Sequence, residues 1–469
     1  MPLERGVAPR FAAALFVLIF VPGAALAQTA PPKATLAIVG GYLIDGHGGP
    51  PTSDAVILID GKQIVAVGRR DSLKVPAGAK VIDASGYSIL PGLINAHVHL
   101  DLIGHSDYDE WHHKYVPGSP AYLRVVETGA RQLIMGGVTT AVDLAGHPDA
   151  LKSVRERSAK GDLPAPRMIL SLGWIWHASP DVAARNHRFN HTFNVNGAEE
   201  ARAAAIKTIE MGADIIKIWN GATAPEVKAV SEEAHKKGLK VTGHTAGDAD
   251  TISRITNGQD GVEHHSYDVD NPEVLRTMLA RRTVVDPTPI QTLAAVEAID
   301  WPEWRNDPRA RALTPPDMWA EIRPSLEFMD RLPYFGRAYR PALFEQMQHT
   351  VKTLHSAGVR LVLGTDSGTP ANFHVDSTWR QMAMYVKFGI PPMDVIAMAT
   401  RQGAEWVGLG SKTGTIEPGR LADIIVVNGN PLADMSSLKD PVYVIKDGVQ
   451  FKGPAAAEPT ARPSTQAKR

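Results

Sequence analysis

Eight short apolar segments alternate with amphipathic helices through the middle of this 469-residue chain, from about residue 93 to residue 410. The segments are GLINAHVHL, VTTAVDLAG, RMILSLGW, ADIIKIWNG, LKVTGH, DGVEHH, RTVVDPTP and VRLVLGTDSG. Helical stretches such as GAEEARAAAIKTIEMG lie between them and end at glycine, as helices often do. Eight successive strand–helix units predict an α/β fold, the closed (β/α)₈ or TIM barrel, over residues 91–410. A doubly wound open sheet is the alternative, but we find no G-x-G-x-x-G motif after a strand.

Two β-rich segments flank the predicted barrel. Residues 28–90 contain β-branched runs that are broken by Gly, Asp-Gly and Pro, and IDGKQIVAV has the pattern of a hairpin that turns at Asp60-Gly61. The same texture returns in residues 411–452. We therefore expect one small β-sandwich lobe that is built from both ends of the chain.

One connection in the predicted barrel is much longer than barrel loops usually are. It spans residues 290–358 and carries the aromatic and Arg-rich runs DWPEWRND, PPDMWAE and RLPYFGRAYRP. Long segments of this composition more often form a lid or a wall of a binding site than a disordered linker. We expect this insertion to cover or border the mouth of the barrel.

The N-terminus has the three-part pattern of a secretory signal peptide. Arg5 and Arg10 precede the apolar stretch FAAALFVLIFV, and small residues stand before Gln28. An uncleaved membrane anchor is the alternative, but the apolar stretch is short for a span of about 20 residues. The sequence thus predicts that residues 1–27 are removed, that the mature chain starts at Gln28 without a stable membrane anchor, and that it is periplasmic or secreted. The Pro- and Ala-rich tail, 453–469, is predicted to be disordered.

Charge and cysteine content exclude several classes of protein. Lys and Arg number 49 against 50 Asp and Glu, so no basic footprint indicates nucleic-acid binding. The chain has no cysteine, which rules out a disulfide framework and a lipid anchor on Cys. An exported chain of this kind must be held by its core or by metal ions. Its expected partner is a small-molecule substrate, and assembly into a homo-oligomer is left open.

Two histidines stand at the end of the first predicted barrel strand. His97 and His99 are two residues apart, so their side chains point to the same side of the strand. At the carboxyl end of a barrel strand that side is the mouth, where barrel active sites lie. One inward histidine is more often a satisfied core residue, whereas two on one face each need a buried partner. The pair is a candidate metal site.

Lys217 lies in the apolar strand ADIIKIWNG. A buried lysine is rare and costly unless it is paired. It could form an ion pair with a carboxylate such as Asp366. Alternatively, desolvation could lower its pKa until the neutral amine reacts with carbon dioxide, and the resulting carbamate could bridge two metal ions.

Other predicted strands also end on metal-type donors. LKVTGH ends on His244, DGVEHH on Glu263, His264 and His265, and VRLVLGTDSG on Asp366. Nitrogen and oxygen donors of this kind suit Zn²⁺, and also Mn²⁺ or Co²⁺. Together the strand ends offer two overlapping coordination spheres. The candidate ligands are His97, His99, Lys217, His244, His264 and Asp366.

These motifs resemble the metal-dependent amidohydrolase superfamily, and most closely its imidazolonepropionase-like and prolidase-like (Xaa-Pro dipeptidase-type) binuclear branch. NAHVHL, IIKIW, GHTAG, VEHHSY and GTDSG match that pattern in order and on the expected strands. The lobe pieces LPGLINAHVH and GTIEPGRLADIIVVNGNP match as well, so that the resemblance covers about residues 35–452.

The resemblance implies a role for each candidate ligand. His97 and His99 would bind a buried metal ion together with Asp366, and carboxylated Lys217 would bridge it to a second ion. His244 and His264 would bind that second, more exposed ion. His264 is chosen over His265 because the family has Glu-His on the sixth strand, although strand parity alone does not decide between them.

The implied activity is hydrolysis of an amide-like carbon–nitrogen bond. Two cations lower the pKa of a water that bridges them, and Asp366 can accept its proton and pass it to the leaving amine. N-acyl amino acids, dipeptides and aryl amides all fit as substrates. The same site could serve an esterase or lactonase, and a non-catalytic metal-binding barrel is a further alternative that the intact donor set disfavours.

The loops that would contact a substrate depart from the resemblance. The loop after the third strand lacks the usual Gly-Gly-His, and the loop after Lys217 is short. Trp174, Trp176 and Trp219 indicate either a large, partly aromatic substrate or packing under loops. The candidate substrate-binding residues are His177, His187, His191, Trp219 and His265.

Overall fold

The computed structural model of the chain describes residues 33–186, 192–300, 302–331 and 340–454. The predicted signal peptide, nearly all of the predicted tail, and the candidates His187 and His191 lie outside these ranges.

Eight parallel strands form a closed barrel, as the sequence predicts. Hydrogen bonds join β6 to β7 and β8, and join β11 through β15 in order; β9 continues the path of β8 and pairs with β11. Asp214 N donates to Leu170 O at 2.8 Å and Ala96 N to Leu363 O at 2.8 Å, and these two contacts close the ring. The strands are β6 (Leu93–Val98), β7 (Val138–Asp143), β8 (Arg167–Leu170) with β9 (Trp174–Trp176), β11 (Ile215–Ile218), β12 (Lys240–Gly243), β13 (Gly261–Glu263), β14 (Val284–Asp286) and β15 (Arg360–Leu361).

The barrel interior changes from apolar to polar along its axis. An apolar floor is formed by Ala96, Val142, Leu144, Ile215, Val284, Val362 and Trp406. Because side chains alternate along a strand, the residues two positions further on β11 and β14 also face inward, and these are Lys217 and Asp286. The polar layer therefore rests directly on a packed apolar layer, which keeps water out from below.

Gly364 leaves room for this polar layer. It lies two residues beyond Val362, and a Cβ there would overlap the carboxylate of Asp286 and lie 2.7 Å from Cβ of His97. A side chain at residue 364 would therefore displace both groups, so the close packing of β6, β14 and the strand that follows β15 requires glycine.

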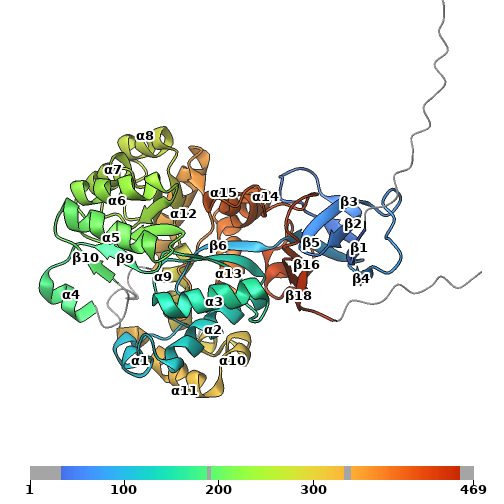
Figure 1. The fold of residues 1–469 in the computed structure, drawn as a ribbon, viewed down its shortest axis with the longest axis horizontal. Helices are drawn as coiled ribbons and strands as arrows, with labels where there is room; N and C mark the ends of the chain where they lie inside the picture. Colours follow the sequence, from blue (N-terminus) through green and yellow to red (C-terminus); the bar gives the residue numbers. More distant parts are fainter. Residues whose placement is uncertain (1–32, 187–191, 301, 332–339, 455–469) are drawn as a thin grey trace, which may run out of the picture. The chain divides into compact units, whose positions relative to one another are not determined.

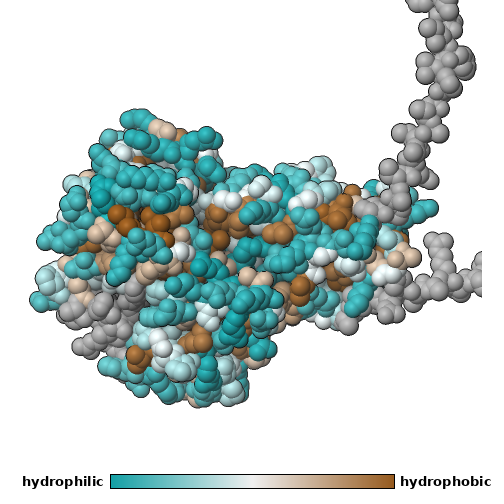
Figure 2. All heavy atoms as spheres, in the orientation of Figure 1, coloured by the Kyte–Doolittle hydropathy of each residue, from teal (hydrophilic) through white to brown (hydrophobic). Residues whose placement is uncertain are grey.

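Helices cover the outside of the barrel (Figure 1). Several begin with proline in the first turn, and α6 has a capping box between Thr223 and Glu226. None of the helices in the described ranges is long and apolar enough to cross a bilayer, and hydrophilic side chains predominate on the face drawn in Figure 2. The helices outside residues 290–358 are α1 (Tyr108–Lys114), α2 (Pro120–Met135), α3 (Pro148–Lys160), α4 (Pro180–Asn186), α5 (Ala198–Glu210), α6 (Ala224–Lys236), α7 (Asp248–Thr256), α8 (Pro272–Arg281), α13 (His374–Lys387), α14 (Pro392–Ala397) with the π-helical turn Met398–Gln402, and α15 (Gly403–Trp406). A short strand, β10 (Thr192–Asn194), lies between α4 and α5.

The long connection between β14 and β15 is helical rather than a loop. Its described parts are α9 (Pro289–Asp300), the 3₁₀ turn Pro302–Asn306, α10 (Pro308–Leu313), α11 (Pro316–Ser325), the 3₁₀ turn Leu326–Arg331 and α12 (Arg340–Ser356). The ring centroid of Trp319, in α11, lies 5.7 Å from that of Phe373, which precedes α13. Both belong to a buried cluster that also includes Ile103 and Trp111. The insertion thus rests on loops at the mouth of the barrel. Its role as a substrate wall remains a prediction.

Strands from both ends of the chain form the smaller lobe, as predicted (Figure 1). Their order is β18-β17-β16-β5-β1-β2-β3, with β4 also paired to β1. The hydrogen bonding is continuous through these strands, which run both parallel and antiparallel, and side chains from both ends of the chain share one apolar cluster. The strands are β1 (Leu36–Leu43), β2 (Thr52–Asp60), β3 (Gln63–Arg69), β4 (Lys80–Asp83), β5 (Tyr87–Pro91), β16 (Ile424–Asn428), β17 (Tyr443–Lys446) and β18 (Val449–Lys452); a 3₁₀ turn, Met435–Leu438, lies between β16 and β17.

Candidate metal centre and active site

The six candidate ligands lie at the carboxyl ends of five barrel strands. His97 and Lys217 are within β6 and β11, and the other four follow β6, β12, β13 and β15 by at most a few residues. Parallel strands present their carboxyl ends at one edge, so the barrel itself gathers these side chains at its mouth.

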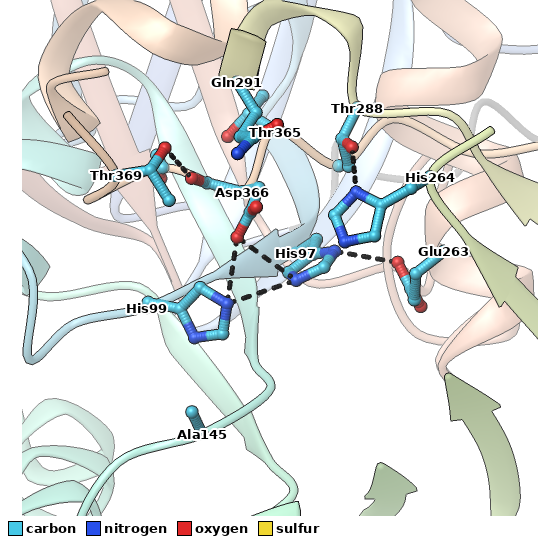
Figure 3. Close-up of polar contacts among 12 residues, drawn as sticks. His97, His99, Ala145, Glu263, His264, Thr288, Gln291, Thr365, Asp366 and Thr369 are labelled. Carbon is cyan, nitrogen blue, oxygen red and sulfur yellow. Dashed lines mark hydrogen bonds and ion pairs between the residues drawn. The ribbon is translucent and has the colours of Figure 1, made fainter. Parts of the chain in front are cut away.

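His97, His99 and Asp366 form the first group of contacts (Figure 3). The Nε2 atoms of the two histidines are 3.3 Å apart, which confirms that the side chains project together. Oδ1 of Asp366 lies 2.9 Å from Nε2 of His99 and 3.4 Å from Nε2 of His97. Two imidazole nitrogens and one carboxylate oxygen therefore converge on one point, as a metal-binding group requires.

His244 and His264 form the second group. Their Nε2 atoms are 3.0 Å apart, while Nδ1 of His264 contacts the Thr288 hydroxyl at 2.6 Å and Nδ1 of His244 contacts Oδ1 of Asn220 at 3.1 Å. Hydrogen bonds to both Nδ1 atoms orient the rings and leave the Nε2 atoms facing each other. This is the pairing expected of two ligands of one metal ion.

The backbone explains why His264 rather than His265 faces the site. His264 has a left-handed φ of 66°, which breaks the alternation of side chains at the end of β13. Its ring points toward Asp366, and ligand atoms of His97, His264 and Asp366 all lie within 4.8 Å of one another. His265 instead directs Nδ1 to the carbonyl of Pro287 at 3.3 Å. The geometry supports His264 as the ligand.

Lys217 is 2% exposed, and its Nζ has no hydrogen-bond partner among the described residues. The ion pair with Asp366 considered from the sequence is not formed within 4 Å in the described chain. Burial lowers the pKa of the Lys217 amine, although the charges of Glu263, Asp366 and Asp286 oppose this effect. The site thus contains a desolvated amine that no protein group in the described chain satisfies.

Asp366 remains ionised despite being buried. Burial alone would raise the pKa of its carboxyl, but the charges of His97 and His99 and the hydrogen bond from His99 hold that pKa below its usual range. Its φ is 51°, and its carbonyl accepts hydrogen bonds from Thr369 at 2.8 Å and Asn372 at 3.2 Å. These contacts hold the strained backbone in a conformation that aims the carboxylate at both histidines.

Two buried carboxylates, Glu263 and Asp286, are functional candidates whose roles sequence reasoning missed. Oε2 of Glu263 lies 2.8 Å from Nδ1 of His97, and Oε1 accepts a hydrogen bond from the Thr242 hydroxyl. Asp286 accepts a hydrogen bond from Gly364 N at 3.0 Å, and burial together with the charge of Glu263 raises its pKa. Each stands at the end of an apolar strand, as the candidate ligands do. This position in the sequence could have identified both carboxylates as site residues.

Glu263 determines which nitrogen of His97 is free. A carboxylate only accepts hydrogen bonds, so the contact fixes the proton on Nδ1 and leaves the lone pair of Nε2 for a metal ion. Glu263→Gln places an amide there that can accept from or donate to Nδ1, and the tautomer is no longer fixed. We expect metal affinity to fall about 10- to 100-fold, measured by competition with a chelator. Thr242→Val, which leaves the contact with His97 in place, is the matched control, and equal affinities of Glu263→Gln and wild type would contradict this role.

The described substrate-binding candidates are arranged less directly. Nδ1 of His177 is 2.8 Å from Oε1 of Glu226 and is therefore engaged by α6. Trp174 and Trp176 are buried, 8% and 3% exposed, which favours packing under loops for these two. Trp219 is half-buried, and its ring lies 5.9 Å from that of His244. Trp219 is thus the substrate-binding candidate whose ring packs beside a candidate metal ligand, His244.

The residues present fit a divalent metal centre. Four imidazoles, one carboxylate and one unsatisfied amine lie at one barrel mouth, and nitrogen and oxygen donors of this kind suit zinc and its neighbours. A second group of potential ligand atoms, from His97, Glu263 and Asp286, also lies within 4.8 Å. Since Glu263 uses Nδ1 of His97, this second group is better explained as support for the first.

Comparison with known proteins places the chain in a family. The Amidohydrolase family pattern matches residues 88–450. An ochratoxinase from Aspergillus niger is 25% identical over 488 residues and covers 92% of this chain and 89% of the relative, and a 5-methylthioadenosine/S-adenosylhomocysteine deaminase from Symbiobacterium thermophilum is 24% identical and covers 84% and 85%. The crystal structure of a Xaa-Pro dipeptidase with bound methionine superposes with a TM-score of 0.69 at 26% identity, over 89% of this chain and all of that one.

The family match spans most of the chain, including the barrel, the C-terminal strands β16 and β17 of the lobe and all six candidate ligands, whereas β1 to β4 precede it. The fold, the convergent donors and the relatives agree. The chain belongs to the amidohydrolase family, within its prolidase-like branch, and is a hydrolase that acts on carbon–nitrogen bonds.

Proposed function

We propose that this enzyme hydrolyses the amide bond of a small molecule, an N-acyl amino acid, dipeptide or aryl amide, at a centre of two divalent metal ions. The observation that carries the proposal is Lys217. Its buried amine has no partner in the described chain, although four imidazoles and an ionised carboxylate gather at the same barrel mouth. A fold that tolerates such an amine needs a compensating group to bind it.

Carboxylation of Lys217 would supply that compensation. The neutral amine, which the lowered pKa favours, forms a bond to the carbon of carbon dioxide and releases a proton, and a carbamate anion results. Its two oxygens can bind two cations. His97, His99 and Asp366 would hold one ion, and His244 and His264 the other, with Zn²⁺ the expected metal and Mn²⁺ or Co²⁺ alternatives.

Bound cations would supply an activated water for attack and polarise the substrate carbonyl. Asp366 would accept the proton of the attacking water and pass it to the nitrogen that leaves. Its low pKa keeps it ionised, and its backbone contacts keep the carboxylate aimed at the site. His97 and His99 contact Oδ1 of this carboxylate and help to fix its position.

The need for a proton at the leaving group favours an amide over an ester. An amine leaves only after it is protonated, whereas an alcohol is a better leaving group and depends less on a proton donor. Asp366 would provide this proton shuttle. The chain also resembles the structure of a Xaa-Pro dipeptidase, an enzyme named for cleaving a peptide bond, and this similarity supports a peptide-like substrate bond. Ester or lactone hydrolysis by the same site is the second candidate.

We also propose that the enzyme acts in the periplasm or outside the cell. The proposal rests on the N-terminal pattern of two arginines, an apolar stretch and small residues before Gln28. A small-molecule substrate is its expected partner.

Metal removal and reconstitution test the proposal. The protein is stripped with a chelator, reloaded with Zn²⁺, Mn²⁺ or Co²⁺, and assayed against dipeptides, N-acyl amino acids, aryl amides and lactones. We expect the stripped protein to be inactive and the reloaded protein to regain activity on at least one amide class, with kcat/KM well above that for lactones. Full activity after stripping, or activity on lactones alone, would contradict it.

A further inference from the structure

Trp219 stands directly above the candidate bridging lysine. Ile215 belongs to the apolar floor, whereas Ile216 and Ile218 face the outer helices. By alternation, Lys217 and Trp219 face the barrel axis, and Trp219 lies nearer the mouth. Its N donates to the carbonyl of Ile175 at 2.8 Å, so the strand pairing continues through this residue and alternation still holds there.

The backbone and the ring of Trp219 are both held firmly. Its carbonyl accepts a hydrogen bond from the guanidinium of buried Arg254 at 3.0 Å. Its ring centroid lies 4.8 Å from that of Trp174 and 5.0 Å from that of Trp176, both of them buried. Because two buried rings pack against it and its backbone is hydrogen-bonded, Trp219 is a rigid aromatic platform rather than a mobile surface side chain.

The surroundings of this platform are apolar. Ala145, Trp174 and Trp176 form a buried cluster, and Ala178, Val182, Ala183 and Trp219 pack against it. The cluster draws on the segments after β7, β8 and β11, three neighbouring strands of the barrel. The next strand, β12, leads to His244, whose ring lies 5.9 Å from that of Trp219 at an interplanar angle of 69°. The apolar cluster around Trp219 therefore borders His244, a candidate metal ligand.

We propose that Trp219 determines specificity by stacking against a planar aromatic ring that adjoins the scissile amide. This inference rests on the proposed amidase function and narrows its substrate class to aryl-substituted amides. A ring on the indole platform would leave the adjacent carbonyl next to His244 and His264, the ligands of the more exposed ion.

Matched pairs of substrates separate stacking from simple apolar burial. N-benzoylglycine and N-benzylacetamide carry an aromatic ring on the acyl and on the amine side, respectively. N-(cyclohexanecarbonyl)glycine and N-(cyclohexylmethyl)acetamide replace that ring with a saturated ring of similar size. For at least one pair, we expect wild-type enzyme to favour the aromatic member by about tenfold in kcat/KM. The preferred pair identifies which side of the amide carries the ring.

Trp219→Leu should reduce kcat/KM for the aromatic member by at least about tenfold and bring the ratio between the two members close to one. Trp219→Phe should restore most of the preference, because it retains a stacking face. An equal loss for both members would show that Trp219 only supports the fold, and an unchanged ratio would show that it does not contact substrate; either result overturns the proposal.

A binding measurement keeps this test separate from the proposed activity. Calorimetry with metal-free protein compares N-benzoylglycine with N-(cyclohexanecarbonyl)glycine, and needs no turnover. If wild type hydrolyses no amide but binds the benzoyl compound more tightly, and Trp219→Leu loses that difference, then the amidase proposal fails and the platform stands. If amides are hydrolysed without an aromatic preference in rate or binding, the platform proposal fails alone.

Discussion

Replacing Lys217 with methionine will leave a folded protein that no longer holds two metal ions. Methionine has a similar volume and no charge, so it fills the same space but cannot form a carbamate. We expect bound metal to fall below two ions per chain and kcat/KM to fall by about 10³-fold, because each bound ion contributes several kcal/mol to the transition state. Metal analysis of the purified variant and steady-state kinetics measure both effects.

The same variant separates function from stability. In the metal-free state the buried amine lacks a partner in the described chain and is costly, so removing it should leave the melting temperature of Lys217→Met equal to or above that of metal-free wild type. Lys240→Met, at a side chain that is 52% exposed, is the matched control and should keep both metal and activity. A Lys217→Met protein that binds two ions and remains active would refute the bridging carbamate.

Asp366→Asn will retain most of the fold and lose catalysis. The amide oxygen can still approach His97 and His99, but the side chain cannot accept a proton and is a weaker metal ligand. General acid–base catalysis by one group contributes about 10²- to 10⁴-fold, and we expect a loss near the upper end because Asp366 would also bind metal. Steady-state kinetics with metal in excess measures the loss of the proton shuttle. Asp71→Asn on the lobe, 71% exposed, is the control, and a loss of less than tenfold would exclude Asp366 as the shuttle.

Acid stability provides a second readout for Asp366 in the metal-free protein. The folded-state pKa of Asp366 is below the usual value of about 3.9. Its ionised form therefore stabilises the fold above that pH, and this contribution is lost as the pH falls toward the folded-state pKa. The free energy of unfolding should thus decrease less between pH 5 and about pH 3 in Asp366→Asn than in wild type, as denaturant unfolding measures. Identical decreases would indicate that Asp366 is not held ionised.

The repeating pattern of this chain made the barrel predictable. Alternation of apolar strands and amphipathic helices is a local property of the sequence, and so is the position of a donor at the end of a strand. Closure of the barrel then brings those ends together, and for this reason His97, Lys217 and Asp366 could be assigned to one site before their distances were known.

Features that depend on tertiary contacts were not predictable in the same way. The choice between His264 and His265 depends on a left-handed backbone at residue 264, which alternation does not indicate. The role of Glu263 depends on a contact 166 residues away in sequence, with His97. The insertion was expected to be a long loop because its Pro and aromatic runs obscure helical periodicity, whereas its helices are stabilised by packing against Phe373 and other distant residues.

Zinc titration of metal-free wild-type protein, with and without bicarbonate, tests the central claim most directly. Bound metal is counted per chain after removal of excess zinc. A site that is bridged by carboxylated Lys217 should bind two ions per chain when bicarbonate is present and fewer when carbon dioxide is rigorously excluded, and added bicarbonate should restore both the second ion and amide hydrolysis. Two tightly bound ions and full activity in the absence of carbon dioxide would contradict the account.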